Sequence, residues 1–405
     1  MRLLRSAGIA FTGSALAFLA VSSGLDRMAE AGRSDPSLVP PPIRAGATRA
    51  QAAAALQAGD YRRGLSAARG AVAHEPMDAT ALGLLGEAAL LSGDRDGAAR
   101  AFSVSRQLGW REPLTQIYWI EAGLAHGDFK AAIEPLDALL RQSPGFAGRR
   151  IWLTRFEATP QGRRLLIDRL ARRPSWLVPY FADINTELAG DPIVRSDVAV
   201  GLVRRRGLRD CHLVAPIIEA LWRFGHGLQS RAIYRLHCAA PGEPASPADG
   251  DFVRARTAQP GTILDWRFTQ DGAVGVALES RAEVPGRAVV VSSMAPLTMS
   301  FASQPLTLAT GRYRVSWRAV DGTGKPSSAT DVAISCVSGE HGWADKRLED
   351  PSADRFAADV SIASQCTAQW LYLGIAPGAD RVSVGDIRID RIGTITPVAN
   401  GAASP

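Results

Sequence analysis

Hydrophobic and polar positions follow two different periods along this chain. Up to about residue 240, apolar side chains recur at helical spacing in segments divided by short polar turns. From residue 251 to 393 they alternate with polar ones; in the stretch 312–318, for example, Tyr313, Val315 and Trp317 share one face. Short alternating segments divided by Gly or Pro predict about eight or nine strands here and no helices. We therefore expect a multidomain chain, an α-helical solenoid followed by an antiparallel β-sandwich of jelly-roll type.

Within the helical part, one turn recurs at a fixed interval. Gly-Asp pairs begin at Gly59, Gly93 and Gly127, which are 34 residues apart. Three further columns keep the same step: Leu65, Ala99 and Ile133; Ala68, Phe102 and Leu136; Pro76, Trp110 and Pro144. In such a turn Gly takes the left-handed position that ends one helix, and Asp caps the first turn of the next. The pattern predicts helical hairpins, which bury their apolar faces only by stacking on neighbouring repeats.

The middle unit resembles the tetratricopeptide repeat family. It reads Leu82-x2-Leu85-Gly86-x2-Ala89 and then Ala98-x3-Phe102, and its neighbours keep Gly64-x3-Ala68 and Ala132-x3-Leu136. The resemblance covers residues 46–145 and implies a concave surface, built from the first helix of each hairpin, that holds a protein partner. Its geometry places four polar residues on that surface, a mixed charged lining suited to a polar or basic peptide segment: Arg49, Gln57, Glu87 and Glu121.

The remaining boundaries follow from composition. Residues 146–240 keep helical character without the 34-residue register, so we expect degenerate hairpins that extend the solenoid. Their arginine runs at 163–164, 172–173 and 204–206 fit solvated helix faces, and an anion-binding patch is the alternative. The Pro-rich segment 241–250 is the predicted linker to the β-sandwich at 251–393, and residues 394–405 are a predicted flexible tail.

Residues 1–25 have the layout of a secretory signal. Arg2 and Arg5 precede a mostly apolar run from Ala7 to Val21, which is short for a membrane span. An uncleaved membrane anchor and a buried N-terminal helix are the alternatives. The first two readings predict a protein that is periplasmic or anchored in the inner membrane and facing the periplasm. Residues 26–45 are rich in Pro and are expected to form a stiff linker.

Composition narrows the classes of function. The 405 residues carry a formal net charge of +6, and no basic run is interleaved with aromatics, so a nucleic-acid partner is not expected. No spacing of Cys and His matches a metal site, and neither a Gly-rich phosphate loop nor a local Ser-His pairing occurs. We therefore expect no metal, no cofactor and no enzymatic activity, while a catalytic triad assembled from distant residues stays open.

Four cysteines divide into two pairs. Cys211 and Cys238 flank the last predicted helical hairpin, whereas Cys336 ends one predicted strand and Cys366 precedes another. In an exported protein this arrangement predicts two disulfides, one in each domain. Four buried free thiols are the alternative and would fit a cytoplasmic chain.

The strand pattern of residues 251–393, with its closing strand at 387–390, resembles the jelly-roll modules of carbohydrate-binding proteins. Trp343, His341 and Asp345 are the candidate glycan-binding residues, because they lie together in a turn-rich segment where polar groups flank the aromatic ring. The other reading of Trp343 is a loop side chain folded over the edge of the sandwich. Three tryptophans in predicted strands are expected in the core: Trp266, Trp317 and Trp370.

Two functions fit this organisation. The first is a non-catalytic exported scaffold that mediates protein–protein interaction in the bacterial cell envelope through its helical repeats. The second is a glycan-binding protein that acts in cell-surface polysaccharide assembly or export through its β-sandwich. Ligand binding by the isolated sandwich would separate the two.

Overall fold

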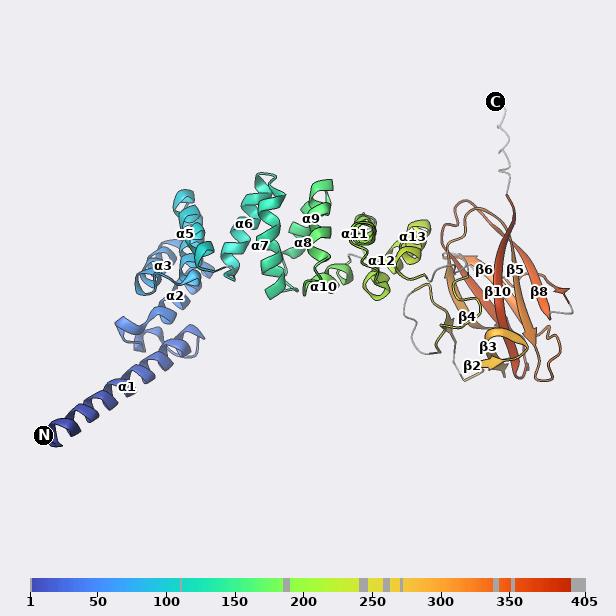
Figure 1. Cartoon of the computed structure of the whole chain (residues 1–405), viewed down its shortest axis with the longest axis horizontal. Helices are drawn as coiled ribbons and strands as arrows, with labels where there is room; N and C mark the ends of the chain where they lie inside the picture. The colour runs from blue at the N-terminus through green and yellow to red at the C-terminus, as the bar shows by residue number, and fades with distance from the viewer. Residues whose placement is uncertain are drawn as a thin grey trace, which may run out of the picture. The chain divides into compact units, whose positions relative to one another are not determined.

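The computed structural model describes residues 2–109, 111–184, 190–239, 247–257, 263–269, 272–337, 342–350 and 354–394. Within these ranges thirteen α-helices precede ten β-strands, which form two antiparallel sheets. This arrangement confirms the expected fold class, an α-helical part followed by a β-sandwich. The chain divides into two compact units, Met1–Trp176 and Leu177–Pro405, whose elements are drawn in Figure 1.

The first unit is a succession of helices joined by short turns. They are α1 (Arg2–Glu30), α2 (Ala45–Gln57), α3 (Tyr61–His74), α4 (Ala79–Leu91), α5 (Arg95–Leu108), α6 (Pro113–Ala125), α7 (Phe129–Gln142), α8 (Arg149–Glu157) and α9 (Pro160–Leu170). Helix α2 packs on α3, α4 on α5, and α6 on α7 (Figure 1). Each predicted 34-residue repeat is therefore one helical hairpin.

The Gly-Asp turns have the conformation that the sequence predicts. Gly59, Gly93 and Gly127 have φ angles of 77°, 88° and 69°, in the left-handed region that glycine adopts without strain. The aspartate after each glycine accepts a hydrogen bond from a backbone N–H in the next helix. Asp94 Oδ1, for example, accepts from Gly97 N at 2.8 Å. The fixed interval thus repeats one turn chemistry.

Close approach within the middle hairpin depends on Gly86. A Cβ atom at this position would lie 2.7 Å from Cζ of Phe102, so the Phe102 ring packs directly on the α4 backbone. Phe102 is 2% exposed, and its ring also stacks on Tyr118 of α6 with centroids 4.3 Å apart. One aromatic side chain therefore joins a hairpin to the next, as the repeat pattern predicts.

The N-terminal segment continues into the repeats. Helix α1 runs without a break from Arg2 to Glu30, and its Asp26 carboxylate accepts hydrogen bonds from Gly46 N at 2.9 Å and Ala47 N at 2.8 Å. Arg44, in the N-cap position of α2, makes no side-chain cap, so Asp26 satisfies these N–H groups instead. Val39 is buried together with Ala29 and Ala47, so the segment expected as a stiff linker contacts both α1 and α2. Among the described residues, no helix combines the length and the apolar content that crossing a membrane requires.

The second unit combines four helices with both sheets. The helices are α10 (Leu177–Ala182), α11 (Gly190–Arg206), α12 (Cys211–Arg223) and α13 (Gly227–His237). The block 146–240, expected as one set of hairpins, is thus shared between the two units. The last hairpin groups with the sandwich because Thr367 Oγ1 donates to Gly225 O at 2.8 Å and Arg231 Nη1 donates to Thr307 O at 3.1 Å. Residues 241–246 of the expected linker lie outside the described residues.

The sandwich consists of a four-stranded and a six-stranded sheet. The strands are β1 (Arg267–Phe268), β2 (Val274–Arg281), β3 (Val284–Ser293), β4 (Met299–Leu306), β5 (Gly311–Val320), β6 (Thr330–Cys336), β7 (Lys346–Asp350), β8 (Arg355–Ile362), β9 (Gln369–Ile375) and β10 (Val382–Gly393). Their orders are β1-β4-β9-β6 and β2-β3-β10-β5-β8-β7. The alternating pattern is weakest at β2 and β7, since both are edge strands with few buried side chains.

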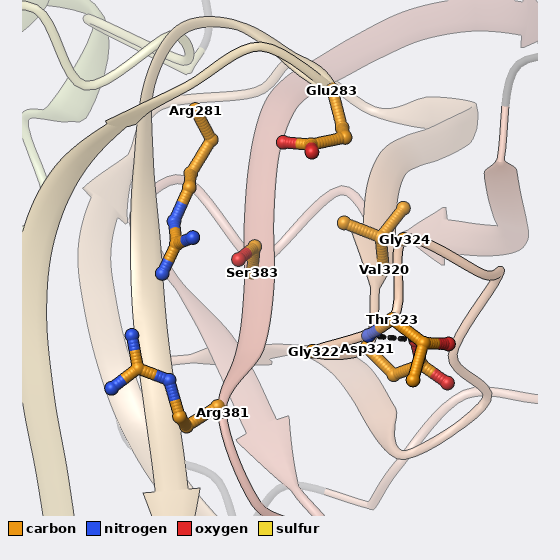
Figure 2. Close-up of a pocket in the computed structure, with 9 residues that line it drawn as sticks. All are labelled: Arg281, Glu283, Val320, Asp321, Gly322, Thr323, Gly324, Arg381 and Ser383. Atoms are coloured by element: carbon orange, nitrogen blue, oxygen red, sulfur yellow. Dashed lines mark hydrogen bonds between the residues drawn. The ribbon is translucent and has the colours of Figure 1, made fainter.

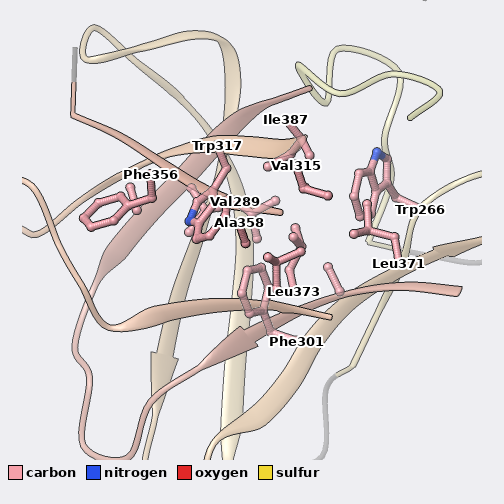
Figure 3. Packing of buried hydrophobic residues seen from close by; sticks show 14 of the residues in the cluster. Trp266, Val289, Phe301, Val315, Trp317, Phe356, Ala358, Leu371, Leu373 and Ile387 are labelled. Carbon is pink, nitrogen blue, oxygen red and sulfur yellow. The ribbon is translucent and has the colours of Figure 1, made fainter. Parts of the chain in front are cut away.

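The core lies between the two sheets (Figure 3). Phe301, Leu371 and Leu373 of the four-stranded sheet pack with Val315 and Trp317 of the six-stranded sheet, and each is at most 1% exposed. Burial of these large apolar side chains is the main stabilising contribution to the sandwich.

Two of the three tryptophans expected in the core of the sandwich are there. Trp266 and Trp317 are core residues, at 2% and 1% exposure. Trp370 is not: Leu371 and Leu373 point inwards along β9, so strand alternation turns Trp370 to the outer face of its sheet. The expectation of a core position is therefore wrong for Trp370.

Both predicted disulfides are present. Cys211 and Cys238 join the start of α12 to the end of α13 with Cα atoms 4.6 Å apart, and Cys336 and Cys366 are joined with Cα atoms 5.5 Å apart. The second pair can form because β6 and β9 are neighbours, which places Cys336 opposite Gln369. Two disulfides indicate an oxidising, extracytoplasmic compartment.

Candidate functional site

Arg49 forms ion pairs with carboxylates of its own unit. Its guanidinium forms ion pairs with Glu30 at 2.8 Å, Glu75 at 2.9 Å and Asp78 at 2.6 Å, and its side chain is 18% exposed. These three carboxylates come from α1, from the end of α3 and from the N-cap of α4. Arg49 therefore ties α2 to its neighbours. Gln57, by contrast, is exposed at the last position of α2.

Glu121 of α6 links its hairpin to the next one. Its carboxylate accepts a hydrogen bond from Trp152 Nε1 and forms an ion pair with Arg155 at 3.4 Å. Arg155 also donates to Leu124 O at 3.2 Å. Half of the Glu121 side chain is exposed, at 51%, so it has a structural contact on one side and solvent on the other.

Glu87 of α4 lies beside a second carboxylate that the sequence did not single out. Glu112 is 5% exposed and caps α6, accepting from Leu114 N at 3.1 Å and Thr115 N at 2.5 Å. Its carboxyl group packs against α4 at Gly83, where a Cβ atom would lie 2.5 Å from Glu112 Cδ. Gly83 is one helical turn before Glu87, so both carboxylates share the surface formed by α4 and α6, here called the α4–α6 face.

The two carboxylates of the α4–α6 face influence each other's ionisation. Burial raises the pKa of Glu87, and the nearby negative charge of Glu112 raises it further. Burial also raises the pKa of Glu112, against the hydrogen bonds from Thr115 and Leu114 that lower it. In the part of the chain that the structure describes, no cation pairs with Glu87. The α4–α6 face therefore presents a partly buried, uncompensated negative charge.

An aromatic strip lies on the outer face of the four-stranded sheet. Trp370 and Tyr372 both point outwards from β9, with ring centroids 6.3 Å apart. Trp343 lies over the same strand at Gly374, where a Cβ atom would be 2.7 Å from the Trp343 ring carbon Cη2. All three aromatic side chains are partly exposed. We call Trp343, Tyr372 and Trp370 the aromatic strip.

One end of the aromatic strip is packed against other elements of the second unit. Trp222 of α12 meets the Trp370 ring edge to face with centroids 4.9 Å apart, and the Arg267 guanidinium lies 5.3 Å from the centroid of the same ring. Trp370 is therefore held in a fixed orientation. The alternation of residues 370–373 groups Tyr372 with Trp370 on one face of the strand, but it does not say whether that face is the buried one.

The predicted glycan-binding residues are only in part brought together. Asp345 is exposed two residues after Trp343, whereas His341 lies outside the described residues. Lys346 Nζ, next along the chain, pairs with Asp331 Oδ1 at 2.6 Å and donates to Thr330 O at 2.9 Å. This pairing anchors the segment that carries Trp343 to β6. The polar side chains of Asp331, Asp345 and Lys346 therefore lie near the Trp343 end of the aromatic strip.

Comparisons with known proteins add little to this geometry. No protein-family model and no curated protein matches the chain. One similar solved structure is TmCBM61 in complex with beta-1,4-galactotriose, at 16% identity and a TM-score of 0.24 over 36% of this chain and 96% of that one. Another is PilW, a widely conserved type IV pilus biogenesis factor, at 15% identity and a TM-score of 0.27 over 50% of this chain and 96% of that one. TM-scores this low carry no argument about the present chain.

Proposed function

We propose that this chain is an exported, non-catalytic binding protein of the bacterial cell envelope whose helical repeats hold a protein partner through the α4–α6 face. The observation that supports this best is the partly buried Glu87 carboxylate beside Glu112, with no cation paired to Glu87 among the described residues. A lysine or arginine of a partner would relieve the repulsion between these carboxylates and gain a charge-assisted hydrogen bond. The partner segment is therefore basic. The two disulfides support export.

Titration with short peptides tests the α4–α6 face. The full chain is mixed with fluorescent peptides of equal length, one rich in lysine and one rich in glutamate, and binding is followed by anisotropy. The lysine-rich peptide binds, and Glu87→Lys weakens it by at least about tenfold because a repulsive charge replaces the attractive one. Asp96→Lys is the matched control, since Asp96 is exposed in the first turn of α5. Equal losses in the two variants would show a general charge effect and refute the assignment.

A second candidate function is glycan binding by the sandwich, and the aromatic strip favours it. An aromatic face packs against the C–H groups of a sugar ring while neighbouring polar groups hydrogen-bond its hydroxyls. An array of neutral oligosaccharides probed with the full chain tests this. Tyr372→Ala abolishes capture, whereas Tyr61→Ala, which removes an exposed tyrosine from α3, leaves it unchanged. Capture that survives Tyr372→Ala would exclude the aromatic strip as the site.

A further inference from the structure

A polar pocket of about 180 Å³ lies on the six-stranded sheet, which is not the sheet that carries the aromatic strip. Figure 2 shows the residues that line it, among them Arg281, Glu283, Thr323, Arg381 and Ser383. They come from the end of β2, the turn before β3, the turn after β5 and the start of β10. We call this the arginine pocket.

One wall of the arginine pocket is built by the tip of the β2–β3 hairpin. Val284 packs with Ala288 and Val320 in a small buried cluster. The side chain of Val284 also lies against β10, since a Cβ atom at Gly385 would be 2.3 Å from Val284 Cγ1. The hairpin tip is therefore fixed on the sheet, and Glu283 next to Val284 is held at the rim of the pocket (Figure 2).

The guanidinium groups of Arg281 and Arg381 lie one above the other on the same side of the arginine pocket, and Asp321 and Thr323 lie on the other side (Figure 2). Arg281 Nη2 pairs with Glu279 Oε2 at 2.6 Å, and Arg381 Nη2 lies 3.9 Å from the other oxygen of the same carboxylate. The Glu279 carboxylate thus contacts both guanidinium groups. Arg281 Nε is buried and makes no hydrogen bond within the described residues. That buried atom is out of reach of a ligand, but one carboxylate has fewer acceptor positions than two guanidinium groups have N–H donors, so other donors remain for an anion.

The backbone holds Arg381 in an unusual conformation. Its φ angle is 47°, in the left-handed region that residues with a side chain seldom adopt. Its N–H donates to Ser292 Oγ at 3.0 Å, which fixes this conformation at the start of β10. Strained conformations of this kind concentrate at binding and catalytic sites, where they aim a side chain.

Ser383 provides a hydroxyl donor in the lining of the arginine pocket. The residue is 5% exposed, and its side chain appears next to the Arg281 guanidinium in Figure 2. Its hydroxyl makes no hydrogen bond in the described part of the chain and is not fully buried, so it is open to a ligand in the pocket. A ligand oxygen in the arginine pocket would supply a hydrogen-bond partner.

Asp321 and Glu283, the two acidic residues that line the arginine pocket, differ in how far their carboxylates are already hydrogen-bonded. Asp321 Oδ1 accepts from Thr323 Oγ1 at 2.7 Å, from Thr323 N at 2.8 Å and from Lys325 N at 3.1 Å, so this carboxylate is used in shaping its own turn. The hydrogen bond from the Thr323 hydroxyl accordingly lowers the pKa of Asp321. The Glu283 carboxylate has no such partner among the described residues and is exposed at the rim. Glu283 therefore has both carboxylate oxygens available to a ligand.

We propose that the arginine pocket binds one carboxylate-bearing sugar unit of the uronic-acid type. The carboxylate lies between Arg281 and Arg381 and accepts from Ser383, and Glu283 accepts from the ring hydroxyls. The volume of about 180 Å³ is below the roughly 300–1,000 Å³ of drug-sized pockets, so it suits a single unit rather than a chain of them. This inference deepens the second candidate function, because both place a saccharide on the sandwich, but it concerns the other sheet.

Calorimetric titration of the full chain with three small molecules tests the proposal. Glucuronate carries both the carboxylate and the hydroxyls, glucose lacks the charge, and acetate lacks the hydroxyls. We expect saturable binding of glucuronate, at least about tenfold weaker binding of glucose and of acetate, and weaker glucuronate binding at high salt. Equal binding of glucose or of acetate, or no saturable binding of glucuronate, would overturn the proposal.

Three variants locate the binding. Arg381→Gln and Ser383→Ala should each weaken glucuronate binding by at least about tenfold, with the thermal midpoint recorded to exclude loss of fold. Arg312→Gln is the matched control, because Arg312 is exposed on β5 of the same sheet and does not line the pocket. Full glucuronate affinity in Arg381→Gln would refute the site.

The aromatic strip and the arginine pocket can be tested separately. Tyr372→Ala should leave glucuronate affinity unchanged, and Arg381→Gln should leave capture of neutral oligosaccharides unchanged. Failure of glucuronate binding with intact oligosaccharide capture overturns only the arginine pocket. Intact glucuronate binding without capture of neutral oligosaccharides overturns only the aromatic strip.

Discussion

The indole rings of Trp222 and Trp370 meet edge to face, with centroids 4.9 Å apart and planes at 79°. Trp222 belongs to α12 and Trp370 to β9, so this pair joins the last helical hairpin to the β-sandwich within the second unit. Trp222 is 3% exposed, and its Nε1 donates to Leu306 O at 3.3 Å. We therefore expect the hairpin and the sandwich to unfold as one cooperative unit.

Trp222→Ala tests this coupling. The variant loses a buried aromatic side chain and a hydrogen bond, so the free energy of unfolding of the second unit should fall by about 3–5 kcal/mol. Urea unfolding followed by far-ultraviolet circular dichroism and by tryptophan fluorescence measures it. Trp343→Ala, which removes a partly exposed ring, should cost less than half as much. A Trp222→Ala variant as stable as the wild type would show that the hairpin and sandwich are independent.

Gly86→Ala tests the close packing inside the repeats. The added methyl group meets the Phe102 ring at 2.7 Å, so overpacking should lower the free energy of unfolding of the first unit by about 1–3 kcal/mol. Thermal unfolding measures the change. Gly145→Ala is the control, because a Cβ atom there has no neighbour within 4 Å and its effect should be within about 0.5 kcal/mol. Equal effects at the two glycines would contradict this packing.

The features that the sequence predicted depend on residues close together in the chain. A Gly-Asp turn needs the left-handed φ of Gly93 and the cap from Asp94, and both act within four residues of the helix end. Strand alternation likewise predicted most strands of the sandwich. Local chemistry and period therefore sufficed for the fold class and the repeat turns.

The sites could be predicted much less well, because they depend on strand order and on packing between elements. Arg281 and Arg381 lie far apart in the chain and meet because β10 is next to β3, which pairs with β2. Glu112 reads locally as the cap of α6, but its position over Gly83 follows from how α6 packs on α4. Alternation alone places Leu371 and Trp370 on opposite faces and does not say which face is buried.

The two disulfides should be found by peptide mapping without reduction, as Cys211–Cys238 and Cys336–Cys366. They close loops with sequence separations of 27 and 30, so each should contribute about 3–4 kcal/mol to the free energy of unfolding in the loop-entropy model. Paired Cys→Ala variants measured by urea unfolding test this estimate. A cross-linked peptide between Cys238 and Cys336 would contradict the structure.

His237 makes the stability of the second unit depend on pH. The side chain is 7% exposed, its Nδ1 accepts from Asp210 N at 3.3 Å, and its Nε2 lies 3.1 Å from Ala199 O. These contacts suit the neutral ring with the proton on Nε2. Burial lowers the pKa of His237 below its ordinary value of 6.5, against the hydrogen bond to Ala199 that raises it, and the charge of Arg209 lowers it further.

The sign of the effect follows from the lowered pKa of His237. The folded protein binds a proton on this ring less readily than the unfolded chain, so the contribution of His237 is fully present above pH 6.5 and is lost as the pH falls through the lowered value. Urea unfolding at pH 7.5, 6.5, 5.5 and 5.0 should therefore show a falling free energy of unfolding in the wild type. In His237→Gln this part of the decline disappears, because glutamine does not titrate, while His212→Gln, at an exposed position of α12, keeps the wild-type slope. Identical pH profiles for wild type and His237→Gln would show that another group carries the dependence.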